Sequence, residues 1–212
     1  MKQIRLQIRF KKNGDLRMIG HRDLARAFER LLRRVELPLA MSEGFHPHPK
    51  INFPSALAVG VEGESEVVEV AVADEVELGT LHERLAGQLP DGLTIVDVRV
   101  MGTNEPKTHV EQVEYSLPVP NEQCESVKAK IAEFLTAESW PVERTNRRGT
   151  KQVDIRPGVH ALELDNNNQL SMRLETTQTY NVKPREILAL LGIENIEDYG
   201  AWLTRTCVYL AS

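Results

Sequence analysis

The amino-acid sequence predicts an α+β protein with antiparallel sheets, and three observations support this prediction. Segments in which polar and apolar residues alternate, as in half-buried strands, are interleaved with segments whose apolar residues recur at helical spacing. The order strand–helix–strand–strand–helix–strand occurs twice in the 212 residues. A polar segment without periodicity, residues 102–109, separates the two occurrences. We therefore expect tandem ferredoxin-like (βαββαβ) domains at residues 1–102 and 110–212.

The first domain is expected to begin with a strand over residues 2–11, where apolar and polar side chains alternate. A helix follows, with Gly20 as its N-cap and Asp23 complementing its N-terminal dipole. Its apolar residues share one face, which should be buried: Leu24, Phe28, Leu31, Leu32 and Val35. Pro38 follows closely and ends the helix.

The rest of the first domain should supply three strands and one helix. We expect strands over residues 50–60, 67–72 and 94–101, a charged turn at residues 62–66 and a helix over residues 78–89. The resulting four-stranded sheet would bury one face under the two helices.

The second domain repeats this order with an extra strand. It should begin with a strand over residues 111–119, followed by a helix that has Asn121 as its N-cap and ends near Thr136. The remaining elements are expected as strands at 140–145, 151–155, 159–164 and 169–177, a helix at 184–191 and a strand at 201–210. The two halves share topology without a recognisable sequence repeat.

The charges of the chain are segregated, although its formal net charge is only -5. Residues 1–60 carry 12 Lys and Arg against 5 Asp and Glu, residues 61–125 carry 3 against 15, and residues 126–212 carry 11 of each. This segregation favours a polyanionic or acidic partner for the basic part. Two distant cysteines without CxxC spacing and short apolar runs indicate a cytoplasmic protein that does not enter a membrane.

A stripe of arginines marks the first helix. The arginines recur at spacings that place them on one face: Arg22, Arg26, Arg30 and Arg33, with Arg34 beside Arg30. Like charges four residues apart repel, so the stripe does little for helix stability. Because guanidinium groups pair well with phosphate oxygens, the stripe indicates a phosphate-binding face. The alternative is a solvated face that the acidic residues 62–77 offset.

The segment SEGFHPHPK at residues 42–50 alternates histidine with proline. Prolines hold the backbone extended, so the side chains of His46 and His48 would point to the same side. They could contact phosphates or bases, act as an acid–base pair in metal-independent RNA cleavage, or form part of a purely structural turn. No third ligand lies at a recognisable spacing, so no metal site is predicted.

Two further features complete the candidate binding residues. His21, at the start of the basic helix, could bind an anion together with the free backbone N–H groups there, or it could merely cap the helix. A second basic cluster surrounds an expected hairpin loop at residues 146–149. With the helix it could form a basic groove, or its charges could serve solubility alone, as at many surface hairpins. The residues expected to contact nucleic acid are Arg22, Arg26, Arg30, Arg33, Arg34, His46, His48, Lys50, Arg144, Arg147, Arg148, Lys151 and Arg156.

Several signatures of enzymes are missing from the sequence. It has no GxGxxG, P-loop, radical-SAM cysteine, HExxH or GxSxG motif, so no cofactor or catalytic residue is predicted. Aromatic residues make up only 5% of the chain, which argues against base stacking of the RNA-recognition-motif type.

Residues 14–53, GDLRMIGHRDLARAFERLLRRVELPLAMSEGFHPHPKINF, together with the following LAVGVEGESEVVEV, resemble the radical-SAM-linked protein family. The DIRP sequence at residues 154–157 is similar to that family's second block. Where the family has Ser-His-Leu-Asp, this chain has Gly20-His21-Arg22-Asp23. Because family members are encoded beside, or fused to, a radical-SAM protein, the resemblance implies a radical-SAM enzyme as partner.

These observations lead to the hypothesis of a non-catalytic accessory protein that binds RNA, such as tRNA or rRNA, and acts with a radical-SAM partner. One alternative is a metal-independent ribonuclease that uses His21, His46 or His48 as acid and base, by analogy with the tandem ferredoxin-like CRISPR repeat-RNA endonucleases. The other is a protein-interaction module whose basic helix docks on the radical-SAM enzyme.

Overall fold

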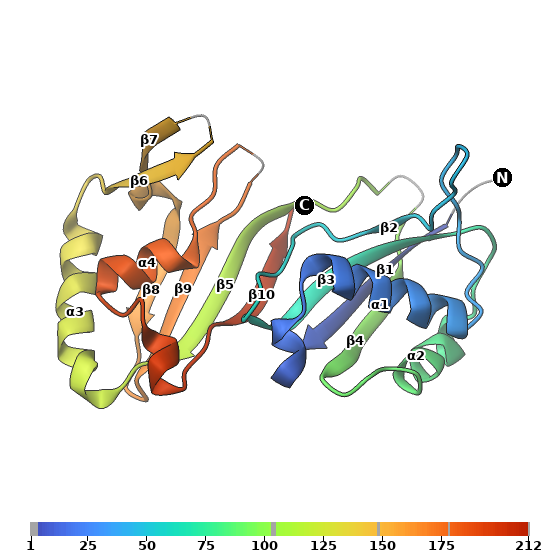
Figure 1. The fold of residues 1–212 in the computed structure, drawn as a ribbon, viewed down its shortest axis with the longest axis horizontal. Coiled ribbons are helices and arrows are strands. Elements are labelled where there is room, and N and C mark those ends of the chain that lie inside the picture. The colour runs from blue at the N-terminus through green and yellow to red at the C-terminus, as the bar shows by residue number, and fades with distance from the viewer. Residues whose placement is uncertain (1–3, 103–104, 148, 178, 212) are drawn as a thin grey trace. The chain divides into compact units, whose positions relative to one another are not determined.

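A computed structural model of the chain describes residues 4–102, 105–147, 149–177 and 179–211 (Figure 1). Helices and mostly antiparallel strands are mixed along the chain, so the predicted α+β class is confirmed. The chain divides into two compact units. The first ends at His109 and also includes Ala211, and the second covers Val110–Leu210.

The strands of the first unit lie in an order that differs from their order in the sequence. In space they are β4 (Leu93–Val100), β1 (Ile4–Lys12), β3 (Glu62–Val72) and β2 (Ile51–Asn52). All three pairings between neighbours are antiparallel. A 3-10 helix (Gly14–Met18) leads into α1 (His21–Arg34), and α2 (Leu78–Ala86) joins β3 to β4. Figure 1 shows both α-helices on the same face of these strands.

The core of the first unit forms where α1 packs on the strands. Gly20 is the N-cap of α1, as predicted. The predicted apolar stripe of α1 is buried, and Leu6, Ile8 and Phe10 of β1 belong to the same cluster. The ring centroids of Phe10 and Phe28 lie 4.7 Å apart. Such a contact stabilises the core by about 1 kcal/mol beyond the effect of the buried apolar area. This packing holds the opposite, basic face of α1 toward solvent.

The prediction of a charged turn at residues 62–66 is wrong, because these residues form the first part of β3. They pair with the end of β1, and the register aligns Phe10 with Glu66. Charge explains why acidic residues are accommodated here. Lys11 forms an ion pair with Glu64, and this hydrogen bond is the main reason that the pKa of Glu64 is lowered.

The predicted length of the strand over residues 50–60 is also wrong, since β2 contains only two residues. Pro54 cannot donate a ladder hydrogen bond, which favours the end of the strand near it. Phe53 packs edge-on against the rings of Phe28, at 5.5 Å, and Phe10, at 6.2 Å. The chain then leaves the sheet, and the N–H of Gly60 donates to the carbonyl of Arg17.

Residues 105–109 of the polar segment belong to the first unit and contact its strands. Arg99 of β4 binds Glu105 at 2.7 Å, and the N–H of Gly102 also donates to that carboxylate. These two hydrogen bonds, with Arg99 the larger cause, lower the pKa of Glu105 to about 2. The Gln7 amide donates to Thr108 at 3.0 Å, which satisfies a side chain that β1 buries. This segment therefore covers part of β1.

The strands of the second unit follow the same kind of order. In space they are β10 (Thr204–Leu210), β5 (Val110–Pro118), β9 (Gln169–Glu175) and β8 (Val159–Leu164), with antiparallel pairings. A separate hairpin, β6 (Pro141–Asn146) with β7 (Gly149–Asp154), supplies the extra strands. The helices are α3 (Asn121–Thr136) and α4 (Pro184–Leu191), with short 3-10 helices at Arg156–Gly158 and Ile196–Tyr199.

The start of α3 differs by one residue from the prediction. Pro120 is the N-cap and Asn121 is the first helical residue. The Asn121 side chain accepts a hydrogen bond from Asn168, so it is directed to another loop and does not cap the helix. Among the described residues, no helix combines the length and apolar character needed to cross a bilayer.

Candidate functional site

The five arginines of α1 are all exposed, as the helical spacing predicts. Three of them contact neighbours within the first unit. Arg26 lies 3.6 Å from Asp23, Arg33 donates two hydrogen bonds to Glu29, and Arg34 donates to the carbonyl of Gln88. Within the described parts of the chain, the two other guanidinium groups, of Arg22 and Arg30, have no hydrogen-bond or ion-pair partner.

The acidic residues that follow in the sequence are turned toward other groups. Glu62 accepts a hydrogen bond from the N–H of Gly14, and Glu64 accepts from Lys11 and Asn13. Glu69 accepts from the N–H of Thr108. These three carboxylates are therefore engaged by β1 and the segments around it, and not by the arginines of α1.

A pocket of about 310 Å³ lies beside the N-terminal half of α1. We call it the histidine pocket. Its lining comes from α1, the His–Pro segment and β2 with the residues after it: His21, Ala25, Arg26, Glu29, His48, Pro49, Ile51, Asn52 and Phe53. It brings together His21, Arg26 and His48, three of the residues singled out in the sequence. His46 is not part of this lining.

Aromatic packing holds the wall of the histidine pocket. The rings of His21 and Phe53 meet edge to face, with centroids 5.3 Å apart and an interplanar angle of 83°. Phe53 in turn packs on the core rings, so the position of His21 is coupled to the core. Two imidazoles, one guanidinium and one carboxylate around a hollow can bind an anion or transfer protons at neutral pH.

A second, larger hollow of about 570 Å³ lies beside the C-terminal half of α1. We call it the arginine groove. Its residues come from α1 and from the loop after α2: Ala27, Arg30, Arg33, Arg34, Gln88, Leu89 and Pro90. Three guanidinium groups thus meet a wall that carries apolar and amide groups, an arrangement suited to phosphate oxygens next to a less polar ligand surface.

The segment between α1 and β2 forms a closed loop, residues 41–49, which we call the His–Pro loop. Met41 and Pro49 form an isolated antiparallel bridge at its base. The N–H of Ser42 donates to the carbonyl of His48 at 2.7 Å, and the N–H of His48 donates to the Ser42 hydroxyl at 3.0 Å. Figure 1 shows the loop projecting from the first unit between α1 and β2.

The tip of the His–Pro loop exposes its side chains to solvent. His46 is exposed there, and Lys50 is exposed just beyond the base. Phe45 is 102% exposed, although phenylalanine is usually buried. Sequence reasoning missed Phe45 because only the loop geometry separates a tip residue from a core residue.

The second basic cluster has two kinds of residues. Arg144 is only 15% exposed and binds Glu186 through two hydrogen bonds of 2.6 and 2.7 Å. Burial acts to raise the pKa of Glu186, but hydrogen bonds from Arg144 and the Lys183 N–H outweigh it and the pKa is lowered. Arg156 donates to the carbonyl of Leu135 and lies 5.2 Å above the Phe134 ring centroid. These contacts favour structural roles for Arg144 and Arg156.

The remaining basic residues of this cluster lie on the β6–β7 hairpin. Arg147 and Lys151 are exposed there, so they are accessible to a partner. Arg148 was also expected to contact nucleic acid, and it lies outside the described residues.

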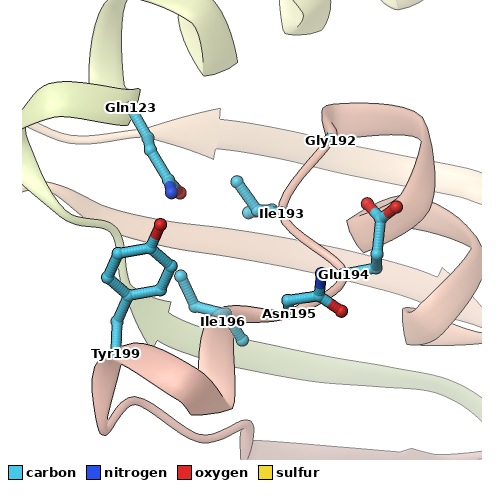
Figure 2. A pocket seen from close by; sticks show the side chains of 7 residues that line it. All are labelled: Gln123, Gly192, Ile193, Glu194, Asn195, Ile196 and Tyr199. Atoms are coloured by element: carbon cyan, nitrogen blue, oxygen red, sulfur yellow. The ribbon is translucent and has the colours of Figure 1, made fainter.

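The second unit has a small hollow of about 140 Å³ that the sequence did not indicate. It is lined by Gln123, Gly192, Ile193, Glu194, Asn195, Ile196 and Tyr199. Figure 2 shows the Gln123 amide and the Tyr199 hydroxyl directed toward each other, whereas the Glu194 carboxylate points away. In the described chain the Gln123 Oε1 atom is buried without a hydrogen-bond partner.

Metal binding needs several ligands close together. Among residues 4–102, 105–147, 149–177 and 179–211, no group of three or more His, Cys, Asp or Glu side chains is placed to hold a metal ion. Both cysteines, buried Cys124 and half-buried Cys207, are free thiols.

The fold and these surfaces define an α+β protein of two units, the first of which exposes a basic helix between two hollows. The chain belongs to the family described as "Uncharacterized protein conserved in bacteria (DUF2344)", which matches residues 5–184. No curated protein matches the sequence.

Two solved structures are similar over nearly the whole chain. One is an unknown protein from Galdieria sulphuraria, at 12% identity and a TM-score of 0.27, covering 99% of each chain. The other is a putative glycine cleavage system transcriptional repressor, at 7% identity and a TM-score of 0.28, covering 100% of this chain and 99% of that chain. Likeness at these TM-scores does not bear on function.

Proposed function

We propose that this protein is a non-catalytic accessory protein that binds RNA, such as tRNA or rRNA, through α1 and the His–Pro loop. It acts with a radical-SAM enzyme in the cytoplasm. The observation that carries the proposal is the stripe of exposed arginines on α1, with a hollow on either side.

The charges around α1 support a polyanionic ligand. Arg22 and Arg30 have no internal partner among the described residues, and Glu62, Glu64 and Glu69 are engaged elsewhere. Uncompensated like charges on one helix face cost stability, so a ligand that pairs with them gains free energy. Phosphate esters provide such a ligand, because each guanidinium group can pair with two oxygens.

The arrangement of strands supports the same proposal. Each unit is proposed to be a ferredoxin-like βαββαβ domain, with the β6–β7 hairpin as an addition to the second. In that fold the helices cover one face of the sheet, and a helix exposes its outer side to solvent.

The proposal of a radical-SAM partner rests on the resemblance of residues 14–53 to the radical-SAM-linked family. The free thiols fit a reducing cytoplasm.

Titration of labelled bulk tRNA with the wild-type protein tests this proposal. We expect binding that weakens with salt, with a slope of log affinity against log salt of at least about 2 in magnitude, one phosphate each for Arg22 and Arg30. Binding without salt dependence, or no binding at all, would contradict it. A complex with the radical-SAM enzyme that resists ribonuclease but needs the arginines would instead identify α1 as a protein-docking face.

A second candidate function is metal-independent RNA cleavage, and one observation favours it. His21 and His48 line the same pocket with Arg26. One imidazole could accept the proton of a ribose 2′-hydroxyl while the other protonates the leaving oxygen, and the guanidinium could stabilise the charge on the phosphate.

Incubation of labelled RNA with the protein in EDTA decides between binding and cleavage. A ribonuclease of this kind should cleave the RNA, and His48→Ala should remove cleavage while His82→Ala, an exposed histidine of α2, should not. Intact RNA after incubation with the wild-type protein would contradict the hypothesis of metal-independent RNA cleavage.

A further inference from the structure

The most exposed large apolar side chain in the described first unit is Phe45, at the tip of the His–Pro loop. Three other phenylalanines, Phe10, Phe28 and Phe134, are at most 1% exposed. A phenylalanine that is fully in water contributes nothing to the core, so its ring is available to a ligand.

The loop constrains the backbone that carries this ring. Its base is closed by the Met41–Pro49 bridge and by the two hydrogen bonds between Ser42 and His48. Pro47 and Pro49 fix two backbone angles, and Gly44 takes a positive φ of 116° that gives the turn before Phe45. Because the base, the two prolines and the turn constrain the backbone, contact with a ligand costs less backbone entropy than it would in an open loop.

The surroundings of Phe45 fit a nucleobase better than a protein pocket. The neighbours at the tip, Glu43, Gly44, His46 and Pro47, are exposed and form no extended apolar patch. The other large exposed apolar residue of the loop is Met41, at its base. A stable protein interface needs a large contact area around such an anchor, whereas a single base needs one ring face and nearby cations.

Groups that can contact a phosphate lie on the chain next to the loop. Lys50 is exposed directly after the base, and His48 joins Arg26 in the histidine pocket. A short RNA segment with a phosphate near these groups could place one of its bases on the Phe45 ring.

We propose that Phe45 stacks on an unpaired base, so that the RNA bound by this protein presents a single-stranded segment, loop or bulge. This inference rests on the proposed RNA-binding function and names the class of RNA. Bases in a continuous duplex are already stacked on both faces and would not reach the ring.

The test compares a short single-stranded RNA with a duplex of the same sequence, each titrated against the wild-type protein and variants. Phe45→Ala should weaken binding of the single strand about tenfold, in the range measured for loss of one stacked base, and leave duplex binding and the salt slope unchanged. Phe45→Trp should retain affinity. Val59→Ala, another exposed apolar residue of the first unit, is the matched control and should change nothing.

The outcomes separate this inference from the function on which it rests. If the wild-type protein binds RNA but Phe45→Ala binds single strands equally well, the stacking role is wrong and the RNA-binding proposal stands. An equal loss on single strand and duplex also overturns it. If the wild-type protein binds neither RNA, both proposals fail. Loss of a protein partner with unchanged RNA affinity would assign Phe45 to a protein contact.

Discussion

Replacing Arg22 and Arg30 by glutamate should lower the affinity for tRNA about a hundredfold. Both guanidinium groups are exposed and, in the described chain, have no internal partner, so their loss removes ligand contacts without breaking internal ones. Each reversal removes an attraction and adds a repulsion, about 1.4 kcal/mol per site. The salt slope should also fall by about 2, one counterion for each lost phosphate contact. The measurement is a filter-binding titration at several salt concentrations.

The control for this variant carries the same change of net charge elsewhere. Lys107→Glu with Lys128→Glu reverses two exposed lysines that are not part of α1, and it should bind nearly as well as the wild-type protein. Of the two, Lys128 has a surface ion pair with Glu125 at 3.1 Å, which this control also removes. Equal loss in both double variants would mean that the overall charge, and not α1, determines binding. Arg26, Arg33 and Arg34 are less suitable targets, because their contacts with Asp23, Glu29 and Gln88 would be lost at the same time.

Gly92→Ala should destabilise the first unit by about 3 kcal/mol. Gly92 has a φ of +86°, which costs an alanine about 1–2 kcal/mol. A Cβ atom there would lie 2.6 Å from the carbonyl oxygen of Asn13 and 3.2 Å from Cγ of Leu16. The backbone of Asn13 cannot easily yield, because its N–H donates to the Gly92 carbonyl at 2.8 Å. The remaining cost comes from displacing this contact.

Hydrogen exchange of the β1 amides in urea measures this effect on the first unit. Both tryptophans, Trp140 and Trp202, lie in the second unit, so their fluorescence provides an internal control that should not change. Gly60→Ala is the matched variant, because Gly60 has nearly the same φ of +83° but open space around its Cβ position. Gly60→Ala should lower the stability of the first unit only by the cost of a positive φ for alanine, about 1–2 kcal/mol. Equal effects at both glycines would show that the close approach to Asn13 is unimportant.

The sequence predicted most elements because their periodicity is strong. The apolar stripe of α1 and its exposed arginines follow directly from helical spacing. Residues 62–66 were missed as strand because acidic side chains are rare in strands, and only the pairing with Lys11 and the segment around it makes them acceptable. The early end of β2 agrees with Pro54, a local signal that the predicted strand over residues 50–60 does not take into account. The packing of Phe53 on Phe10 and Phe28 is a tertiary contact that no local pattern contains.

The candidate site was predicted in part. His21 and His48 were each singled out, but their place in one pocket depends on how the His–Pro loop folds back toward α1. The sequence also does not reveal that Arg144 differs from the exposed residues of the second basic cluster. Its ion pair with Glu186 joins residues 42 positions apart in the chain. Sequence spacing reports which face of an element a residue occupies, and it does not report which distant partner that face meets.

The pairing of β5 with β10 has a consequence for how the second unit is attached. Val110 and Leu210, its first and last residues, are register partners on neighbouring strands. Entry and exit of the chain are therefore adjacent, which is the geometry of an inserted module. Such a module can be transferred into another chain, or re-opened at a surface hairpin after its ends are joined by a short peptide, without moving either end.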